Sequence, residues 1–307
     1  MVSADKHAVV LERMLLLRAL PQFADLSPSH LATMAEVAQD RFFPTGSLIQ
    51  PEGAPVRRIH FVISGEVEIR RSGRVVRTLG ERSVVGGLAA LAQVGDAAQV
   101  VAKTDVSTFS FSREDQRDVF EDDFEVLSRI VRSVARGLLE ARWAAGPDAG
   151  FCPDDESAPL PRAPLDLVDR LAFLRRTAEY SQACLEALAE LACESPEVHL
   201  ASGETLWRAG DASGSSLVMV AGVVEGAADQ GRQRFRFSTG SIVGGLDSLA
   251  SVPRWYDATA ATDVVAIQIS DGVLLDVLED HTQMAMDLLR VLASSLIALR
   301  ERLASSS

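Results

Sequence analysis

Much of this chain occurs twice, and the second copy follows the first at a nearly constant distance. Thr45–Ile69 lines up with Ser202–Gly226 at a shift of 157 positions, and three glycines fall on three glycines. Ser83–Leu91 then lines up with Ser241–Leu249 at a shift of 158, after a change of one residue in a loop. A doubled VGGLxxL sequence flanked by collinear glycines indicates a tandem duplication. The chain is therefore expected to fold as two similar domains.

Each repeat carries the same order of secondary-structure signals. A stretch with apolar residues at helical spacing comes first, within 31–38 in one repeat and 185–192 in the other. Short runs rich in β-branched residues follow, divided by glycines, which is typical of a small barrel or jelly roll. The strands expected in the first repeat are 47–50, 59–63, 66–70, 75–79, 100–101 and 106–111. The expected closing helices are 113–144, broken near 121–123, and 271–303, broken near 280.

The segment between the repeats is unsuited to regular structure. Residues 146–164 contain five prolines and several acidic residues, a composition typical of a linker. We therefore expect a first domain over residues 1–145, a linker over 146–164 and a second domain over 165–307. The predicted fold is mainly β with flanking α-helices, in the form of two β-roll (jelly-roll) domains in tandem.

Charge and cysteine content exclude several classes of protein. The 43 acidic residues outnumber the 30 basic ones and give a net charge of −13, which is unfavourable for general binding to nucleic acid or anionic lipid. Three cysteines without a CxxC pair argue against a disulfide framework and a structural zinc site. Apolar stretches such as Leu217–Val224 are too short to cross a bilayer, and the amino end does not resemble a signal peptide. We expect a cytoplasmic protein with no DNA and no membrane among its partners.

The glycine spacing and the GG-L-x-x-L segments resemble the cyclic-nucleotide-binding domain family. The resemblance rests on Gly46, Gly53, Phe61–Val67 and Val85–Leu91 in the first repeat, and on Gly203, Gly210, Val218–Val224 and Val243–Leu249 in the second. In that family the segment that starts at the paired glycines, here named the phosphate cassette, holds the cyclic phosphate. A tandem pair is similar to the regulatory subunits of cyclic-nucleotide-dependent kinases. The catabolite activator family has a helix-turn-helix domain after one copy, and we expect none here.

The resemblance implies a candidate ligand site in the second repeat. Its residues are Gly244, Gly245, Leu246 and Arg254, because a helix start offers free amides to an anion and an arginine pairs with a phosphate. The family has a glutamate for the ribose hydroxyl at the position that Gly245 occupies. A weak or altered ligand, including a different nucleotide, is therefore left open for this repeat.

The cassette of the first repeat departs further from the family. Its residues are Gly86, Gly87 and Asp96, with Gly87 in place of the glutamate and Asp96 in place of the arginine. A carboxylate that faces a phosphate is repulsive, and removing it from water adds to the cost. We expect this cassette to be degenerate and not to bind a cyclic nucleotide in the usual way.

Two interpretations of Arg254 stay open. It either pairs with a phosphate, or it is a solvated loop arginine or the partner of Asp257. Trp255 and Tyr256 follow it, and their bulk could fill the pocket. An open cavity with Arg254 pointing into it would favour a receptor. An aromatic ring across the cavity would favour a domain that no longer binds a ligand.

We expect no catalytic residue and no metal ligand set. No two of the five histidines lie within twenty residues of each other, and no GxSxG, GxxxxGK[ST] or GxGxxG sequence occurs. Cys184 and Cys193 are nine residues apart, too far along a helix to bind one ion, and we expect both to be buried as small apolar residues. No cofactor is expected, apart from a possible cyclic nucleotide in the second domain.

The closing helices carry apolar stripes that look longer than one roll can cover. The stripes include Ile130 and Val134 in the first helix, and Leu288 and Leu292 in the second. We expect part of each stripe to contact the other repeat, a second chain or a protein partner. A homodimer through these helices is one such arrangement.

Together these features predict a non-enzymatic regulatory protein that acts through protein–protein interaction, with cyclic-nucleotide binding lost or altered. The alternative is a true cyclic AMP or cyclic GMP receptor. It would bind the ligand in the second domain through Arg254 and the amides of residues 244–246.

Overall fold

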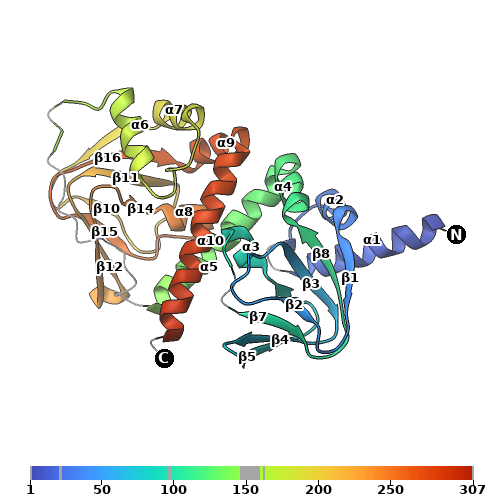
Figure 1. The fold of residues 1–307 in the computed structure, drawn as a ribbon. Helices are drawn as coiled ribbons and strands as arrows, with labels where there is room; N and C mark the ends of the chain where they lie inside the picture. The colour runs from blue at the N-terminus through green and yellow to red at the C-terminus, as the bar shows by residue number, and fades with distance from the viewer. Residues whose placement is uncertain (1, 21–22, 96–97, 146–159, 162, 306–307) are drawn as a thin grey trace. The chain divides into compact units, whose positions relative to one another are not determined.

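The chain forms two compact units, Met1–Ile130 and Val131–Ser307 (Figure 1). The computed structural model describes residues 2–20, 23–95, 98–145, 160–161 and 163–305. Most of the expected linker, 146–164, lies outside the described residues. The units divide inside a helix, whereas the boundary expected after residue 145 comes from the repeat and stays a sequence prediction.

The first unit starts with helices and continues into strands. Ser27 begins the second helix by accepting a hydrogen bond from the His30 amide, and Pro28 occupies the first turn. The elements are α1 (Val2–Arg18), α2 (Pro28–Val37), β1 (Gln39–Phe43), β2 (Leu48–Gln50), β3 (Arg58–Ser64), β4 (Val67–Arg71), β5 (Arg74–Leu79), β6 (Val84–Val85), α3 (Gly87–Ala92), β7 (Gln99–Ala102), β8 (Val106–Ser112), α4 (Arg113–Asp122) and α5 (Phe124–Ala145), whose end belongs to the second unit.

The strands of the first unit pair into two antiparallel sheets, in the orders β1-β8-β3-β6 and β2-β7-β4-β5. Small apolar side chains from both sheets meet in one core. Its buried members are Val62, Val67, Val85, Val100, Ala102 and Val106. These residues come from strands of both sheets, as expected for the core between two packed sheets.

The second unit repeats this arrangement strand by strand. Its elements are α6 (Leu167–Arg176), α7 (Leu185–Glu194), β9 (Glu197–Leu200), β10 (Thr205–Trp207), β11 (Ser215–Ala221), β12 (Val224–Ala228), η2 (Asp229–Gly231), β13 (Gln233–Phe237), β14 (Ile242–Val243), α8 (Gly245–Ala250), β15 (Asp257–Ala260), β16 (Val264–Ser270), α9 (Asp271–Asp280) and α10 (Thr282–Ser305). The sheet orders, β14-β11-β16-β9 and β10-β15-β12-β13, are those of the first unit. The predicted fold, two β-rolls in tandem with flanking helices, is confirmed.

A glycine in the same strand connection of each roll, between β3 and β4 and between β11 and β12, explains part of the repeat. These connections are not hairpins, because the two strands on either side belong to different sheets. Gly65 has φ 89° and Gly222 has φ 87°, in the left-handed region that glycine tolerates. A Cβ at either position would lie 2.2 Å from a carbonyl oxygen, that of Asp105 or Asp263. The positive φ and the nearby carbonyl both require glycine here, whatever the domain binds.

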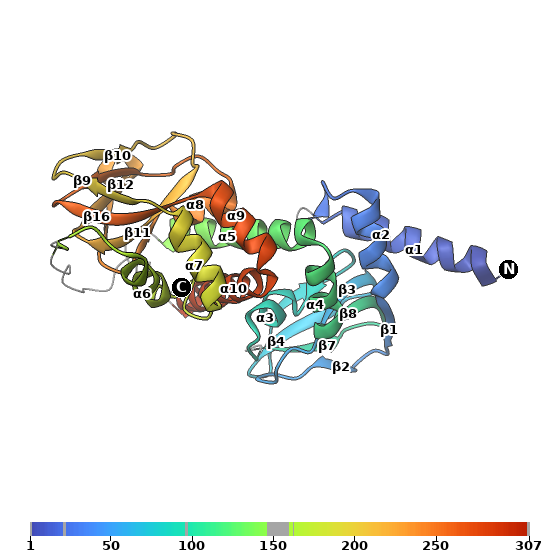
Figure 2. The ribbon, with the colours of Figure 1, turned by 90° about the horizontal axis from the view of Figure 1, so that it is seen from above.

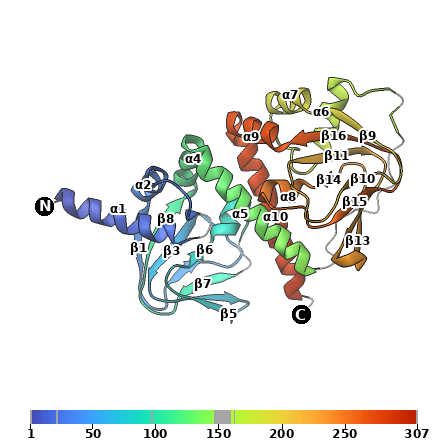
Figure 3. The same cartoon turned by 180° about the vertical axis from the view of Figure 1, so that it is seen from behind.

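The closing helices are broken where the sequence indicates. Asp123 separates α4 from α5, and His281 separates α9 from α10. From Val131 onward, α5 belongs to the second unit. This part of α5 lies against α10 (Figure 3): a Cβ added to Gly137 would lie 3.3 Å from a methyl carbon of Leu296.

Helix α10 corrects one expectation about apolar stretches. Residues Thr282–Leu303 are long and apolar enough to cross a membrane by length and composition, although 44% of the most apolar window is buried inside the protein. Leu288, Leu292 and Leu296 are each at most 3% exposed. This burial is typical of the core helix of a folded domain.

Some strands and both described cysteines differ from the sequence expectations. The strands β1 and β6 of the first unit were not among the strands expected from the sequence. Cys184 and Cys193 were expected to be buried, but both are exposed. They lie at the start and on the polar side of α7, whose buried face consists of Ala187, Leu188, Leu191 and Ala192.

Candidate functional site

The phosphate cassette of the second domain is a sharp turn followed by the short helix α8. Gly244 begins the helix in the left-handed region, at φ 74°. A Cβ on Gly244 would lie 2.2 Å from Nη1 of Arg254 and 3.0 Å from the Trp207 ring. Both the backbone conformation and the close approach of these side chains therefore require glycine. The expected cassette geometry, paired glycines opening a helix, is present.

Arg254 is buried beside the cassette, with 4% of its surface exposed. Its Nη1 donates a hydrogen bond to the Gly244 carbonyl oxygen at 2.9 Å, and Nη2 donates to the Ser215 carbonyl oxygen at 2.5 Å. The guanidinium carbon lies 4.0 Å from the centre of the Trp207 ring, a cation–π contact. The guanidinium thus binds the protein's own backbone and an aromatic face.

The interpretation of Arg254 as a solvated loop arginine, or as the partner of Asp257, is wrong. The carboxylate beside it is that of Asp247, whose Oδ2 lies 3.6 Å from Nη1. Asp257 instead accepts a hydrogen bond from the Ala209 amide. Arg254 is held on its backbone as well, since its amide donates to the Asp211 carbonyl oxygen and its carbonyl accepts from the Gly210 amide, each at 2.8 Å.

Asp247 is the buried acid of this site. It is 1% exposed, and burial raises its pKa from 3.8 to about 6, against the opposing effects of Arg254 and of a hydrogen bond from Trp255. A carboxyl group that is removed from water favours its neutral form, because its charge loses hydration. The Asp247–Arg254 pair is therefore only partly ionised near pH 6.

Tyr256 covers the amide at the start of the cassette. Its hydroxyl oxygen accepts a hydrogen bond from the Gly244 amide at 3.0 Å, and the residue is 2% exposed. Burial raises the pKa of Tyr256 above its ordinary value, so the hydroxyl stays neutral. In the resembling family this amide belongs to the segment that holds the cyclic phosphate.

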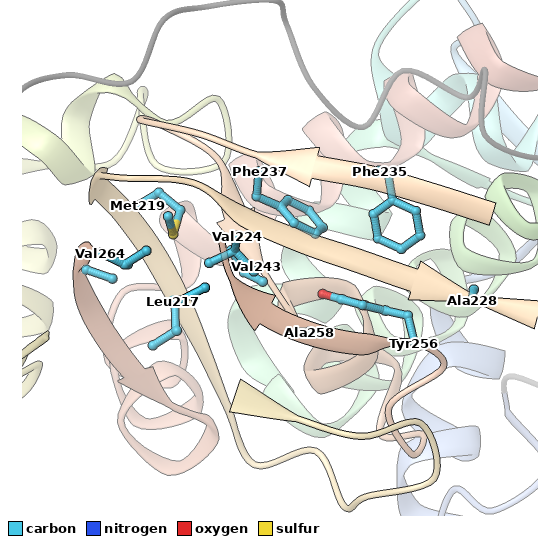
Figure 4. Close-up of a cluster of buried hydrophobic side chains, with 12 residues drawn as sticks. Leu217, Met219, Val224, Ala228, Phe235, Phe237, Val243, Tyr256, Ala258 and Val264 are labelled. Carbon is cyan, nitrogen blue, oxygen red and sulfur yellow. The ribbon is translucent and has the colours of Figure 1, made fainter. Parts of the chain in front are cut away.

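Aromatic rings fill the roll around Tyr256. The ring centroids of Phe235 and Phe237 lie 5.1 and 5.9 Å from that of Tyr256, and those of Trp207 and Trp255 lie 5.7 and 4.9 Å away. Figure 4 shows the Tyr256 ring facing Phe235 and Phe237 across the core, with its hydroxyl directed toward Val243. We name these five side chains the aromatic cluster.

The first domain lacks the aromatic cluster. At the repeat shifts, the cluster positions are occupied by Gln50, Arg77, Leu79, Ala98 and a residue outside the described part of the chain. Gln50 is 6% exposed, and its Nε2 has no hydrogen-bond partner within the described residues. The inside of the first roll is therefore built differently from that of the second.

The first cassette keeps its turn. Gly86 has φ 77° and precedes the helix α3, and a Cβ there would lie 2.9 Å from a methyl carbon of Val56. A Cβ on Gly87 would lie 3.2 Å from Val84. Asp96, the expected repulsive group, lies outside the described residues, and its role stays a prediction.

The four stripe residues of the closing helices are all buried. Ile130 and Val134 are 9% and 7% exposed, and Leu288 and Leu292 are 1% and 3% exposed. Leu288 and Leu292 line a cavity of about 60 Å³, together with Leu246 and Gly245 of the cassette. The inner side of α10 therefore packs behind the phosphate cassette of its own unit.

Two charged groups face the same cavity. Arg142 from the end of α5 and Glu179 line it, and burial lowers the pKa of Arg142 and raises that of Glu179. No group of three histidine, cysteine or acidic side chains suited to a metal ion occurs among the described residues.

Sequence reasoning identified the cassette glycines, Arg254 and the adjacent aromatic pair. It missed Trp207, Ser215 and Asp247, which complete the surroundings of Arg254. Trp207 could have been found, because a tryptophan in one repeat stands where the other repeat has Gln50. The Ser215 contact is a backbone carbonyl, which no sequence pattern encodes.

The fold and its glycine turns define a pair of β-roll domains, each with a phosphate cassette. The model of the cyclic nucleotide-binding domain family matches residues 40–123 and 197–281, which together are more than half of the chain. The chain therefore belongs to this family and has two of its domains in tandem. The family describes binding domains with regulatory roles.

Relatives of known role share part of the chain. The CRP-like cAMP-activated global transcriptional regulator of Mycobacterium tuberculosis is 28% identical over 121 residues, 38% of this chain and 54% of that protein. The chain thus spans about half the length of the curated relatives it matches.

Solved structures also resemble the chain. The regulatory subunit of a cAMP-independent protein kinase A from Trypanosoma brucei is 18% identical, with 90% of each chain covered and a TM-score of 0.36. The N-terminal domain of a transcriptional regulator from Streptomyces coelicolor A3(2) is 25% identical and covers 42% of this chain and 96% of that one, with a TM-score of 0.40.

Proposed function

We propose that this chain is a non-enzymatic, cytoplasmic regulatory protein that acts through protein–protein contact and has lost cyclic-nucleotide binding in its second domain. The observation that carries the proposal is the pair of hydrogen bonds from Arg254 to the carbonyl oxygens of Gly244 and Ser215. Arg254 stands where the family has a phosphate-binding arginine, but here it donates hydrogen bonds to two backbone carbonyls of its own domain.

The energetic argument starts from Arg254. To reach a phosphate, the guanidinium would have to leave both carbonyls and the Trp207 face. The Gly244 carbonyl would keep the hydrogen bond from the Ser248 amide at 3.3 Å, but the hydrogen bond to the Ser215 carbonyl would be lost. A buried carbonyl that loses its donor costs about 1–3 kcal/mol. The phosphate contact would therefore have to offset this loss before it contributed any affinity.

A second cost comes from Tyr256. Its hydroxyl occupies the Gly244 amide, and its ring is packed within the aromatic cluster. A ligand on that amide would have to displace a side chain that is 2% exposed. Gly245 adds no acceptor for a ribose hydroxyl, and a Cβ there would lie 2.7 Å from Ile242.

Exposed apolar side chains support a role in protein contact. Leu11 and Leu15 lie one turn apart on α1 and are 56% and 60% exposed, and Val75 and Val76 on β5 are 52% and 58% exposed. Single exposed apolar residues are common, but neighbouring ones on one element are candidates for a contact surface. The net charge of −13 supports a protein partner rather than nucleic acid or membrane. A homodimer is one form that this contact could take.

The ligand part of the proposal is tested by calorimetric titration of the full chain with cyclic AMP, cyclic GMP and a cyclic dinucleotide. We expect no binding heat, and no shift of the melting temperature in the same mixtures. Micromolar binding that the Arg254→Ala variant loses would overturn the proposal. Arg254→Lys, which keeps the charge, is the control that separates lost binding from lost folding.

The second candidate is a cyclic AMP or cyclic GMP receptor that uses the second domain. Family membership and the presence of an arginine at the cassette favour it. In that case Arg254 would exchange its carbonyl contacts for the phosphate when the ligand enters. Binding that survives in Arg254→Ala would instead point to the first domain, where the aromatic cluster is absent.

The contact part is tested by light scattering after size-exclusion chromatography. If α1 mediates self-association, the double change Leu11→Glu and Leu15→Glu should lower the measured mass to that of a monomer. The exposed change Arg117→Glu on α4 is the control for surface charge.

A further inference from the structure

A thiol, an imidazole and a carboxylate meet at the surface of the second unit. Nδ1 of His281 lies 3.9 Å from Sγ of Cys184, and Nε2 of the same ring lies 3.0 Å from Oε2 of Glu190. We name these three side chains the thiol cluster. Cys184 precedes α7, Glu190 lies on α7, and His281 lies at the break between α9 and α10. Because α7 packs against α9, folding brings together residues more than 90 positions apart (Figure 2).

The contacts of His281 assign a role to each ring nitrogen. An ionised carboxylate can only accept hydrogen bonds, so Glu190 keeps the proton of the neutral ring on Nε2. This leaves the lone pair of Nδ1 directed at the Cys184 sulfur. A nucleophile beside a base that a third group orients is the arrangement of activated thiols and hydroxyls.

The start of α7 adds a second stabilising element. The Cys184 sulfur occupies the N-cap position and accepts a hydrogen bond from the Ala187 amide at 3.5 Å. The amide groups at a helix start favour a negative charge, and a thiolate in this position is more reactive than one in a coil. Helix α7 has ten residues, so these amides are part of a regular helix.

Cys193 provides a comparison on the same helix. It is also exposed, but no polar contact of its sulfur is found within the described part of the chain. It lies near the end of α7, where the helix favours positive rather than negative charge. Cys184 and Cys193 are therefore both exposed, but only the Cys184 sulfur has polar contacts among the described residues.

We propose that Cys184 is a site of reversible covalent modification by small disulfides, with His281 as its base and Glu190 as the positioning residue. His281 takes the thiol proton on Nδ1, and the Cys184 sulfur attacks one sulfur of the disulfide. A new S–S bond forms as the old one breaks, and the leaving thiolate takes the proton from His281. One disulfide and one thiol give one mixed disulfide and one thiol, so no further oxidant is needed.

Modification would act at the joint between two helices. His281 donates its amide to the Val277 carbonyl of α9 and offers its own carbonyl to the Met284 amide of α10. An adduct on Cys184 removes the thiol contact of this residue and places a new group where α7 meets the joint. The proposal is independent of whether the roll binds a nucleotide.

The test compares two full-length variants with one thiol each. In Cys152→Ser with Cys193→Ser, Cys184 is the remaining thiol, and in Cys152→Ser with Cys184→Ser it is Cys193. Both react with a neutral aryl disulfide that releases a coloured thiol, at about pH 7. We expect Cys184 to react about tenfold faster than Cys193, as for thiols near a base and a helix start. Rates that agree within about twofold would overturn the proposal.

Further changes in the Cys184-only chain separate its chemistry from its exposure. His281→Gln should lower the rate to that of Cys193, and Glu190→Gln should lower it to an intermediate value. An unchanged rate in His281→Gln would also overturn the proposal. Circular dichroism before each assay verifies the fold, and in denaturant both single thiols should react alike. Incubation with bis-hydroxyethyl disulfide should leave one adduct, on the Cys184 peptide, which a reductant removes.

Discussion

The Tyr256 hydroxyl accepts the hydrogen bond of the Gly244 amide at 3.0 Å, so a side chain of the domain satisfies an amide of its own phosphate cassette. Arg254 satisfies the carbonyl of the same glycine from the other side, at 2.9 Å. The amide and the carbonyl of Gly244 are therefore both hydrogen-bonded to side chains of the same domain. The cassette is a closed hydrogen-bond network, and this network can be tested one group at a time.

The first prediction concerns the Tyr256 hydroxyl. Tyr256→Phe leaves the buried Gly244 amide without an acceptor and should lower the free energy of unfolding by about 1–3 kcal/mol. Tyr180→Phe is the matched control, because Tyr180 is equally buried and the structure describes no hydrogen bond of its hydroxyl. Urea unfolding followed by tryptophan fluorescence measures both. Equal losses in the two variants would contradict the role of the hydroxyl.

The second prediction concerns the space at Gly244. Gly244→Ala adds a Cβ 2.2 Å from the Arg254 guanidinium and also strains a backbone at φ 74°. Gly203→Ala is the control, because Gly203 has φ 85° but no atom within 4 Å of the added Cβ. The control should cost about 1–2 kcal/mol from backbone strain. Gly244→Ala should cost about 2 kcal/mol more, and similar thermal midpoints for the two would show that the contact is unimportant.

The third prediction concerns Asp247 and pH. Its pKa is about 6 in the folded chain and 3.8 as the ordinary value, so the folded state holds this proton more tightly. Between pH 4 and pH 6 the unfolded state has lost the proton while the folded state keeps it, and stability therefore falls as the pH rises through this window. The difference between the two values corresponds to about 3 kcal/mol.

Asp247→Asn removes that dependence. The stability of the original chain relative to this variant should fall by up to about 3 kcal/mol between pH 4 and pH 7. Glu179 changes with the same sign, because burial raises its pKa, but it is present in both chains and its effect cancels. All three tryptophans lie in the second unit, so their fluorescence reports on it specifically. A constant difference across the pH range would contradict the prediction.

The fourth prediction has the opposite sign and concerns the first unit. His60 is buried beside Thr108, and burial, assisted by Arg58 and Arg41, lowers its pKa from 6.5 to about 4. The unfolded chain gains the proton first on acidification, so stability falls as the pH drops from about 6.5 to about 4. His60→Asn should flatten this loss, measured by circular dichroism beside the fluorescence of the second unit. If the His60→Asn variant loses as much stability on acidification as the original chain, the prediction is wrong.

The fold could be predicted from the sequence because both repeats carry the same order of local signals. Glycines at turns with positive φ and β-branched runs between them are local signals, and both copies carry them. The breaks at Asp123 and near Asp280 were found because charged residues interrupt an apolar stripe. Strand β1 was missed because four of its five residues are exposed and show no alternation.

The site could be predicted only in part. Arg254, Trp255 and Tyr256 are visible in sequence, but whether they face a ligand or the protein depends on distant residues. The guanidinium direction is set by a carbonyl at Ser215 and a ring at Trp207, 39 and 47 positions away. The thiol cluster was missed for the same reason, since His281 and Cys184 meet only through the packing of α7 on α9.

Helix α5 has a consequence for how this chain can be divided. Its residues from Val131 onward are copied with the first repeat but are part of the second unit, where Leu138 and Arg142 form a wall of the cavity behind the cassette. The boundary of the sequence repeat and the boundary of the compact unit therefore differ by part of helix α5. A fragment that starts at the proline-rich segment would lack one side of its own core, and one that ends there would carry fifteen residues of an orphaned helix.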